Sequence, residues 1–276
     1  MHSPVVAWGR RANDLAQFPP ELDAELGQAL DGDEIQILFQ PQVRMSDERI
    51  IGVEALARWA HPRLGELGAD LLFAVAARCG LTAGLSHHVQ EKATCAAATW
   101  EPPLAGLRLS VNVTAADLVQ PDFASRFLRA VQACGFPLDR LTAEVTESEL
   151  ISDLEAAAAA LQRLHEQGVR IALDDFGTGY ASLAYLTALP LDALKIDKGV
   201  ASGIAQARER VVIEGVIAIA HRLGLSVVAE GVETLAQRHL LAEAGVDSWQ
   251  GYLCAPPLTE TALAALLTER ASPDPG

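Results

Sequence analysis

Short apolar runs alternate with longer amphipathic segments from about residue 35 to the end of the chain. Short runs that are rich in leucine and β-branched residues and bounded by polar turns are typical of buried strands. The sequence contains eight of them, at residues 35–43, 50–56, 107–113, 141–145, 169–173, 193–196, 225–229 and 246–249. We therefore predict eight strands.

Amphipathic segments between and after these runs predict helices at residues 71–79, 86–100, 123–134, 154–167, 182–189, 208–223, 235–244 and 259–268. Four of them are followed directly by a glycine, the residue that most easily adopts the left-handed conformation that ends a helix. These are Gly135, Gly168, Gly224 and Gly245. The repeated alternation of strand and helix favours an α/β fold of the TIM-type (β/α)8 barrel class over an open sheet.

One connection departs from this pattern. The link between the first two predicted strands, residues 44–49, is too short for the helical crossover that parallel strands need. The first strand should therefore pair antiparallel in a hairpin, which makes the barrel a modified one. We predict a single domain over residues 21–270, with an N-terminal extension (1–20) and a C-terminal tail (271–276).

The composition of the chain indicates where in the cell it is expected to act and in which state its cysteines are expected. Half of the residues are apolar, yet no run is long enough to cross a membrane, and residues 1–20 lack the apolar stretch of a signal peptide. We expect a cytoplasmic protein without membrane contact. The cysteines are Cys79, Cys95, Cys134 and Cys254. No two form a CxxC pair, so a zinc knuckle has no support, and all four are predicted to be buried, reduced thiols.

The formal charge of −15 excludes a general nucleic-acid binder, because the basic face that DNA binding requires is missing from the pattern. An anionic substrate could bind only where a local cation reverses the sign of the field. A bound metal ion would do this.

Polar residues stand at the ends of nearly all predicted strands. In a barrel the carboxyl ends of the strands meet on one face, where catalytic residues sit. The residues are Glu54, Asn112, Glu144, Asp174, Asp175, Lys195, Asp197, Glu230 and Gln250. One acidic residue after a strand is usually a helix cap, but seven of the eight strands share the feature. Glu144 and Lys195 also have apolar neighbours, where an unpaired charge would be costly.

Carboxylates and an asparagine carbonyl are hard oxygen donors, which suit Mg²⁺ or Mn²⁺ better than zinc. Zinc is further disfavoured because no histidine is predicted at a strand end. The histidines His61, His87, His88, His165, His221 and His239 fall in predicted loops or helices.

Asp174 and Asp175 are adjacent, so both can reach one site only where a strand gives way to a loop. Such a pair could bridge two metal ions about 3.5–4 Å apart, as in phosphate ester hydrolysis; a glycine-rich turn with a capping aspartate is the alternative. Lys195 could be a simple ion-pair partner, or could orient or deprotonate a water. Arg58 lies on the same strand face as Glu54 and could hold a phosphate, unless it is an ordinary surface arginine.

An ordered set of motifs resembles the EAL phosphodiesterase family. The motifs are LFQP (38–41), EALARW (54–59), SVNV (110–113), EVTES (144–148), DDFGTGY (174–180), LKID (194–197), AEGVET (229–234) and QGY (250–252). The resemblance covers about residues 21–268.

The resemblance implies two bound divalent ions, Mg²⁺ or Mn²⁺, and hydrolysis of cyclic di-GMP to linear pGpG. Glu54, Asn112, Glu144 and Asp174 would hold one ion, and Asp174, Asp175 and Glu230 the other. Calcium is expected to inhibit, because it prefers larger and looser coordination than Mg²⁺.

Further roles follow from the resemblance alone. Lys195 would position the attacking water in a catalytic group completed by Glu54, Asp174, Asp175 and Glu230. Substrate contacts would come from Gln40, Leu56, Arg58 and Gln250, while Glu147, Glu233 and Asp197 would support the loop and the metal site. A homodimer is implied, with the loop after Asp175 coupling its interface to the metals.

Some positions depart from the family pattern, namely Ala181, Gly199-Val200, Cys254 and the segment 68–80. None of them is an implied metal ligand. Three hypotheses follow: an active cyclic di-GMP phosphodiesterase, a catalytically weak or inactive receptor that acts by binding cyclic di-GMP, and a two-metal hydrolase of another phosphate ester.

Overall fold

A computed structural model describes residues 19, 21–150, 153–177 and 184–271, with the backbone alone at 148–149. The strands are β1 (Ile35–Arg44), β2 (Ile50–His61), β3 (Gly65–Leu67), β4 (Arg108–Asn112), β5 (Leu141–Thr146), β6 (Arg170–Phe176), β7 (Ala193–Ile196), β8 (Ser226–Ala229) and β9 (Ser248–Gln250). The helices are α1 (Glu21–Asp31), α2 (Ala69–Arg78), α3 (Thr82–Ala98), α4 (Ala115–Leu118), α5 (Phe123–Cys134), α6 (Glu147–Leu150), α7 (Leu154–His165), α8 (Tyr185–Ala188), α9 (Lys198–Ser202), α10 (Ala207–Arg222), α11 (Leu235–Glu243) and α12 (Glu260–Ala271).

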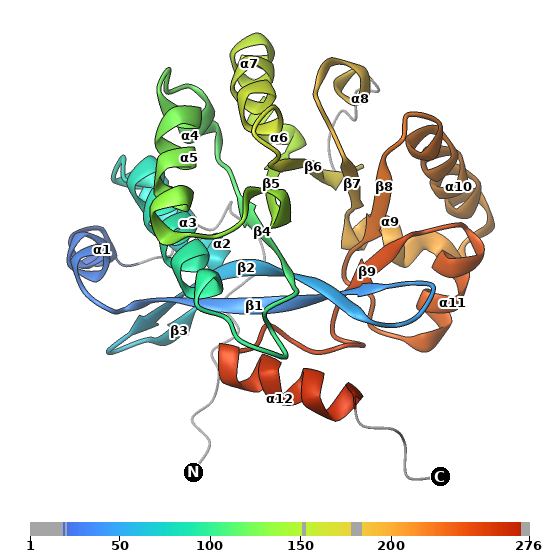
Figure 1. Cartoon of the computed structure of the whole chain (residues 1–276), viewed down its shortest axis with the longest axis horizontal. Helices are drawn as coiled ribbons and strands as arrows, with labels where there is room; N and C mark the ends of the chain where they lie inside the picture. The colour runs from blue at the N-terminus through green and yellow to red at the C-terminus, as the bar shows by residue number, and fades with distance from the viewer. Residues whose placement is uncertain (1–18, 20, 151–152, 178–183, 272–276) are drawn as a thin grey trace.

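The sheet closes on itself into a barrel. Its strand order is β1-β9-β8-β7-β6-β5-β4-β2, and pairing between β1 and β2 completes the ring, while β3 is attached to the edge of β2. β1 is antiparallel to both β2 and β9, and the other neighbouring barrel strands are parallel. The predicted modified TIM-type barrel with an antiparallel first strand is therefore confirmed (Figure 1).

Helices surround the barrel and bury the outward faces of its strands (Figure 1). The main apolar core lies between the strands and the helices. A second apolar cluster packs α1 and α2 against the far end of the β1–β2 hairpin, around Trp59. None of the helices in the described part of the chain combines the length and apolar character needed to cross a membrane. The predicted helix-ending glycines are confirmed, since Gly135, Gly168, Gly224 and Gly245 all have φ between 78° and 94°.

Alternation along the parallel strands divides the barrel interior into layers, because every second side chain points inward. Each of four strands places a small or apolar residue below a charged one, namely Thr142 and Glu144 on β5, Ala172 and Asp174 on β6, Ala193 and Lys195 on β7, and Val228 on β8 with Glu230 directly after that strand. The charged layer lies at the carboxyl ends of these strands, where the candidate site was predicted.

The hairpin extends further than its sequence pattern indicated. β2 continues to His61 because Ala57 and Trp59 pack into the second apolar cluster. The assignment of His61 to a loop was wrong: it is the last residue of β2, it is buried, and its Nε2 lies 2.8 Å from Oε2 of Glu25. Neither α1 nor β3 was predicted, because both depend on contacts with this extended hairpin.

The prediction of four buried, reduced thiols was also wrong. Cys95 on α3 and Cys134 on α5 form a disulfide with Cα atoms 4.7 Å apart, although 39 residues separate them in sequence. Packing of α3 against α5 brings the two together, and Cys95 is exposed. Cys79 and Cys254 are free and only partly buried.

Candidate metal centre

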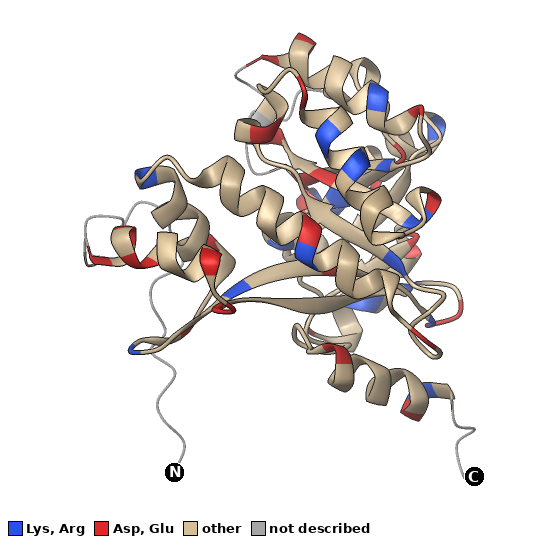
Figure 2. Ribbon diagram, turned by 60° about the vertical axis from the view of Figure 1, so that its left-hand side comes forward, with Lys and Arg blue, Asp and Glu red and all other residues tan. Residues whose placement is uncertain are grey.

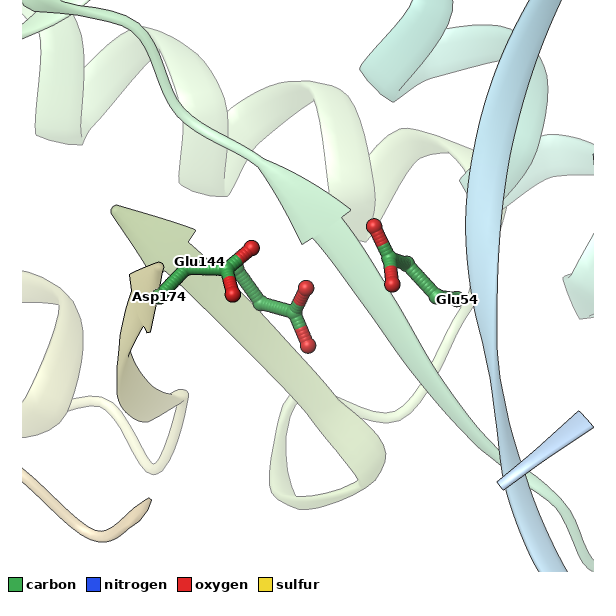
Figure 3. Close-up of side chains that lie close together, drawn as sticks. All are labelled: Glu54, Glu144 and Asp174. Atoms are coloured by element: carbon green, nitrogen blue, oxygen red, sulfur yellow. The ribbon is translucent and has the colours of Figure 1, made fainter. Parts of the chain in front are cut away.

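The carboxyl ends of the barrel strands bring the predicted polar residues together. Glu144 on β5 lies beside Asn112 on β4 in the strand register, and Thr146 lies beside Asp174 on β6. Figure 3 shows Glu54, Glu144 and Asp174 approaching one another from three different strands. The residues span 120 positions in sequence, so the closed barrel is what makes them neighbours.

Lys195 occupies the centre of the group. Its Nζ lies 2.6 Å from Glu144 Oε2, 2.9 Å from Asp174 Oδ2, 2.7 Å from Glu230 Oε1 and 3.2 Å from Glu54 Oε2. The side chain is 1% exposed, and its strand neighbours are buried apolar residues. One ammonium group therefore faces four carboxylates in a largely dry environment.

Two amide side chains complete the hydrogen bonding of the group. Asn112 donates from Nδ2 to Glu54 Oε1 at 3.2 Å. Gln250 donates from Nε2 to Glu54 Oε2 at 2.7 Å and to Glu230 Oε1 at 2.9 Å. These bonds hold the Glu54 carboxylate from both sides of the β1–β2 pair, since β4 neighbours β2 and β9 neighbours β1.

A backbone irregularity brings Asp175 to the same place as Asp174. The β6–β7 register shifts between Leu173 and Phe176, and Asp175 has a φ of 55°, which is uncommon for a residue other than glycine. The Asp175 backbone N–H donates to Asp174 Oδ1 at 2.8 Å. The strand therefore breaks its regular geometry where the sequence analysis required it to.

The carboxylates of the group respond differently to burial. Burial and the neighbouring carboxylates raise the pKa of Glu144 to about 8, although Lys195 opposes the shift. Burial would raise the pKa of Glu54 as well, but Lys195 and hydrogen bonds from Gln250 and Asn112 lower it below its ordinary value. The difference has a physical cause: Glu54 accepts bonds from two amides, whereas Lys195 is the only side-chain donor to Glu144 within the described residues.

The pKa values of Asp174, Asp175, Glu230 and Lys195 also reflect the crowding of negative charge at this site. Burial, followed by nearby carboxylates, raises the pKa of each of the other three acidic side chains. The pKa of Asp174 is raised, that of Asp175 is raised to about 6, and that of Glu230 lies well above its usual range. Burial alone would lower the pKa of Lys195, but its four carboxylate neighbours raise it well above the ordinary value. Five carboxylates against one ammonium leave room for further positive charge.

Two sets of these side chains have the geometry to hold a metal ion. Glu54, Glu144 and Asp174 form one set, and Asp174, Asp175 and Glu230 form the other, with the oxygen atoms of each set within 4.8 Å of one another. Asp174 belongs to both. Hard oxygen donors of this kind fit divalent ions such as Mg²⁺ or Mn²⁺. The two sets coincide with the two predicted ion sites, and Asn112 adjoins the first through Glu54.

A cavity of about 600 Å³ lies above the carboxylates. Its wall includes Glu54, Asp174, Asp175 and Glu230, together with Leu56 from the predicted substrate contacts. The cavity has the size of an ordinary small-molecule site. An anion that enters it would meet the carboxylates directly, so bound cations are needed to reverse the local sign of charge.

Gln40 pairs with Glu54 in the β1–β2 register, and Arg58 follows Ala57 on β2. Glu54 and Ala57 line this cavity, but Gln40 and Arg58 are not among the described residues that do. The buried amide of Gln40 donates to the Ala255 carbonyl at 2.6 Å. Arg58 donates to the Ala57 carbonyl at 2.8 Å, and its Nε lies 3.8 Å from Glu66. Their substrate contacts stay predictions.

The predicted supporting residues fall in different settings. Glu147 is buried, burial raises its pKa, and the loop residues 178–180 that it was expected to steady lie outside the described residues, as does Ala181. Asp197 caps α9 by accepting from the Gly199 N–H at 2.7 Å. Glu233 is exposed and forms an ion pair with Lys198.

The sequence analysis did not predict a buried polar network that lies behind Asn112. Gln90 on α3 donates from Nε2 to the Asn112 carbonyl at 2.9 Å, and Ser86 donates to Asp117 Oδ2 at 2.5 Å. Asp117 also forms a reciprocal capping box with Thr114. The Thr-x-x-Asp spacing of that box was the available sequence signal, whereas nothing local indicated that Asp70 and Phe73 of α2 line the cavity.

Comparisons with known proteins identify the family of this chain. The EAL domain family model matches residues 23–257. Cyclic di-GMP phosphodiesterase NbdA of Pseudomonas aeruginosa is 38% identical over 251 residues, which are 90% of this chain and 32% of that protein. The chain thus spans about a third of the length of this relative.

Solved structures resemble the fold as well. The PaMucR phosphodiesterase in complex with c-di-GMP has a TM-score of 0.83 and 33% identity, covering 88% of this chain and 99% of that one. The calcium/cyclic di-GMP complex of BlrP1 from Klebsiella pneumoniae has a TM-score of 0.74 and 29% identity, covering 84% of this chain and 57% of that one.

Replacement of Lys195 by methionine should destabilise the metal-free protein. The variant keeps the length of the side chain but leaves four buried carboxylates without their cation, which should lower the free energy of unfolding by about 3 kcal/mol or more. Thermal unfolding in EDTA measures the change, with Lys198→Met as the control at an exposed lysine. Equal stability of Lys195→Met and the wild type would contradict the central role of the ammonium.

Proposed function

The chain belongs to the EAL domain family, and from that premise we propose that it hydrolyses cyclic di-GMP to linear pGpG with two divalent metal ions, Mg²⁺ or Mn²⁺. The observation that carries the proposal is the pair of carboxylate sets that share Asp174 at the carboxyl end of the barrel. Shared carboxylates between two ions are the arrangement used for in-line phosphoryl displacement.

Each proposed ligand has a defined place. Glu54, Asn112, Glu144 and Asp174 would hold one ion, and Asp174, Asp175 and Glu230 the other. Bound ions would supply charge stabilisation at the phosphate and a nucleophilic water at neutral pH. The protein's own contribution is to hold these oxygen atoms in position through Lys195 and Gln250 before any ligand binds.

Lys195 would donate a hydrogen bond that orients the attacking water. Its ammonium group touches members of both carboxylate sets, so it lies between the two proposed ion positions. The raised pKa of Lys195 favours the charged form, which suits a hydrogen-bond donor better than a base. Of the two roles considered from the sequence, orientation of the water is therefore preferred over its deprotonation.

The substrate would occupy the 600 Å³ cavity. Leu56 lines it, and we propose that Arg58 and Gln40 turn toward the phosphate and guanine end when the substrate binds, with Gln250 supporting the water. The named c-di-GMP complexes of PaMucR and BlrP1 support this choice of substrate. A cytoplasmic location, expected from the sequence, stays a prediction.

Binding without catalysis is the second candidate function. The structure of BlrP1 is a complex with calcium and cyclic di-GMP, so a protein of similar fold can hold the nucleotide together with a metal ion. All of the implied ligands are present in this chain, which favours turnover over binding alone. A two-metal hydrolase of another phosphate ester is the third candidate.

A homodimer is proposed through α10. Val211 and Val212 are 68% and 63% exposed on this helix, and Val212 and Val200 line one shallow cavity. A Cβ atom at Gly177 would come within 2.7 Å of Val200, so the segment that follows Asp175 packs directly against this surface. A second copy on α10 would therefore be coupled to the metal centre through Val200 and Gly177.

Turnover decides between the candidate functions. Purified protein with Mg²⁺ or Mn²⁺ should convert cyclic di-GMP to pGpG, and Glu54→Gln should reduce the rate on the order of 100-fold or more, because a ligand of the first ion is lost. Glu269→Gln on α12 is the control at an exposed carboxylate. Nucleotide binding without pGpG formation would establish the receptor instead, and hydrolysis of other esters alone would establish the third candidate.

Calcium should support binding of cyclic di-GMP but not its hydrolysis. Ca²⁺ takes six to eight oxygen ligands at roughly 2.3–2.6 Å, whereas Mg²⁺ needs octahedral geometry at roughly 2.0–2.1 Å. Parallel measurements of nucleotide binding and pGpG release in each ion test this. Equal rates in the two ions would contradict the proposed ion geometry.

The dimer is tested by the double replacement Val211→Asp and Val212→Asp. Sedimentation equilibrium should show a dimer for the wild type and a monomer for the variant, since two buried carboxylates would oppose association. Val119→Asp changes another exposed valine, which is not on α10, and should leave the dimer intact. A monomeric wild type would overturn this proposal.

A further inference from the structure

A second cavity opens at the amino end of the barrel, on the opposite side of the carboxylate group. Its volume is about 720 Å³, larger than that of the cavity above the metal centre. Lys195 and Glu144 line this lower cavity, whereas Glu54, Asp174 and Glu230 line the upper one. The ion-paired cluster around Lys195 therefore separates two pockets that lie along one barrel axis.

The lower cavity exists because the inward positions below the charged layer are small. Ser110, Thr142, Ala172, Ala193 and Ser248 all line it. The interior of a TIM-type barrel is usually filled at these levels by bulky branched side chains. The space is thus a feature of this sequence rather than a general consequence of the fold.

Two arginines face this space from neighbouring parts of the barrel. Arg108 begins β4 and Arg170 begins β6, and both line the cavity. Arg170 donates to Ser226 Oγ at 3.4 Å, while the side chain of Arg108 has no hydrogen bond or ion pair to any described residue. Burial, and then the nearby charge of Arg108, lowers the pKa of Arg170, while Asp192 opposes the shift. The two arginines are therefore close enough for their positive charges to repel each other.

The carboxylates near these arginines are already engaged. Asp192, whose charge acts on Arg170, accepts from the Ile171 N–H at 2.9 Å and lies 3.6 Å from His165. Glu144 is bound to Lys195, and Asp247 accepts from the Val227 N–H at 2.7 Å and lies 3.0 Å from His221. Arg44 at the rim pairs with Asp47. Hydroxyl groups of Thr142 and Ser248 face the same space and have no side-chain partner among the described residues. The arginine and hydroxyl groups around this cavity thus form a local concentration of hydrogen-bond donors, in a protein whose formal charge is −15.

We propose that the amino end of the barrel is a second ligand site, which binds a small phosphate-bearing anion, up to the size of a mononucleotide, with its phosphate between Arg108 and Arg170. Guanidinium groups bind phosphate oxygens in pairs of parallel hydrogen bonds. Thr142 and Ser248 supply further donors, and Ile51 and Val228 supply an apolar wall. The volume lies within the range of small-molecule sites, roughly 300–1,000 Å³.

Calorimetric titration with inorganic phosphate and with AMP tests the site. EDTA in the buffer removes divalent ions, so that the metal-dependent cavity does not contribute. The wild type should bind at least one of the two probes, and Arg108→Gln should weaken that binding about tenfold through loss of a charged donor. Arg170→Gln should do the same. Higher ionic strength should weaken binding further.

Two matched arginine variants serve as controls. Arg58→Gln removes an arginine beside the upper cavity, and Arg222→Gln removes an exposed one on α10, so neither should change the affinity. The proposal is overturned if the wild type binds neither probe at millimolar concentration. It is also overturned if Arg58→Gln abolishes binding while Arg108→Gln does not. Arg108 is exposed, so its replacement leaves folding intact and the result interpretable even if Arg170→Gln fails to fold.

Discussion

The contact of one buried ammonium group with four carboxylates is the interaction on which the functional end of this barrel depends. Lys195 lies within 3.2 Å of Glu54, Glu144, Asp174 and Glu230. Burial favours the neutral forms of these groups, and Lys195 opposes that effect at each of them, which helps to keep the charged oxygen donors that a divalent ion requires. Carboxylates outnumber the one ammonium group, so further cations would be attracted to the site.

The same alternation of inward and outward residues produces both ends of the barrel. On β5, for example, Glu144 belongs to the charged layer and Thr142 to the cavity beneath it. Small side chains in the lower layer leave space, and the arginines at the strand starts give that space a positive rim. Figure 2 shows acidic and basic residues interleaved over the outer helices in that view. Inside the barrel, the carboxylates and the two arginines lie at different ends.

The order of strands and the antiparallel start of the barrel could be predicted from the sequence, because both depend on local quantities. The lengths of the apolar runs and of their connections are visible in one dimension, and a link of about six residues excludes a helical crossover. The boundaries of β2 and the existence of α1 and β3 could not be predicted from the sequence. Trp59 and His61 become strand residues only through packing against segments distant in sequence. The disulfide between Cys95 and Cys134 has the same origin.

For the site, the sequence by itself determined which side chains stand at the strand ends, since strand periodicity and residue type suffice for that. Only the tertiary structure decided which of them meet. Closure of the ring brings Lys195 within reach of Glu54, 141 positions away, and the irregularity at Asp175 turns two adjacent aspartates toward one place. It also brought Glu233 into an ion pair with Lys198. Distances between strands depend on the packing of the whole barrel, which local sequence does not encode.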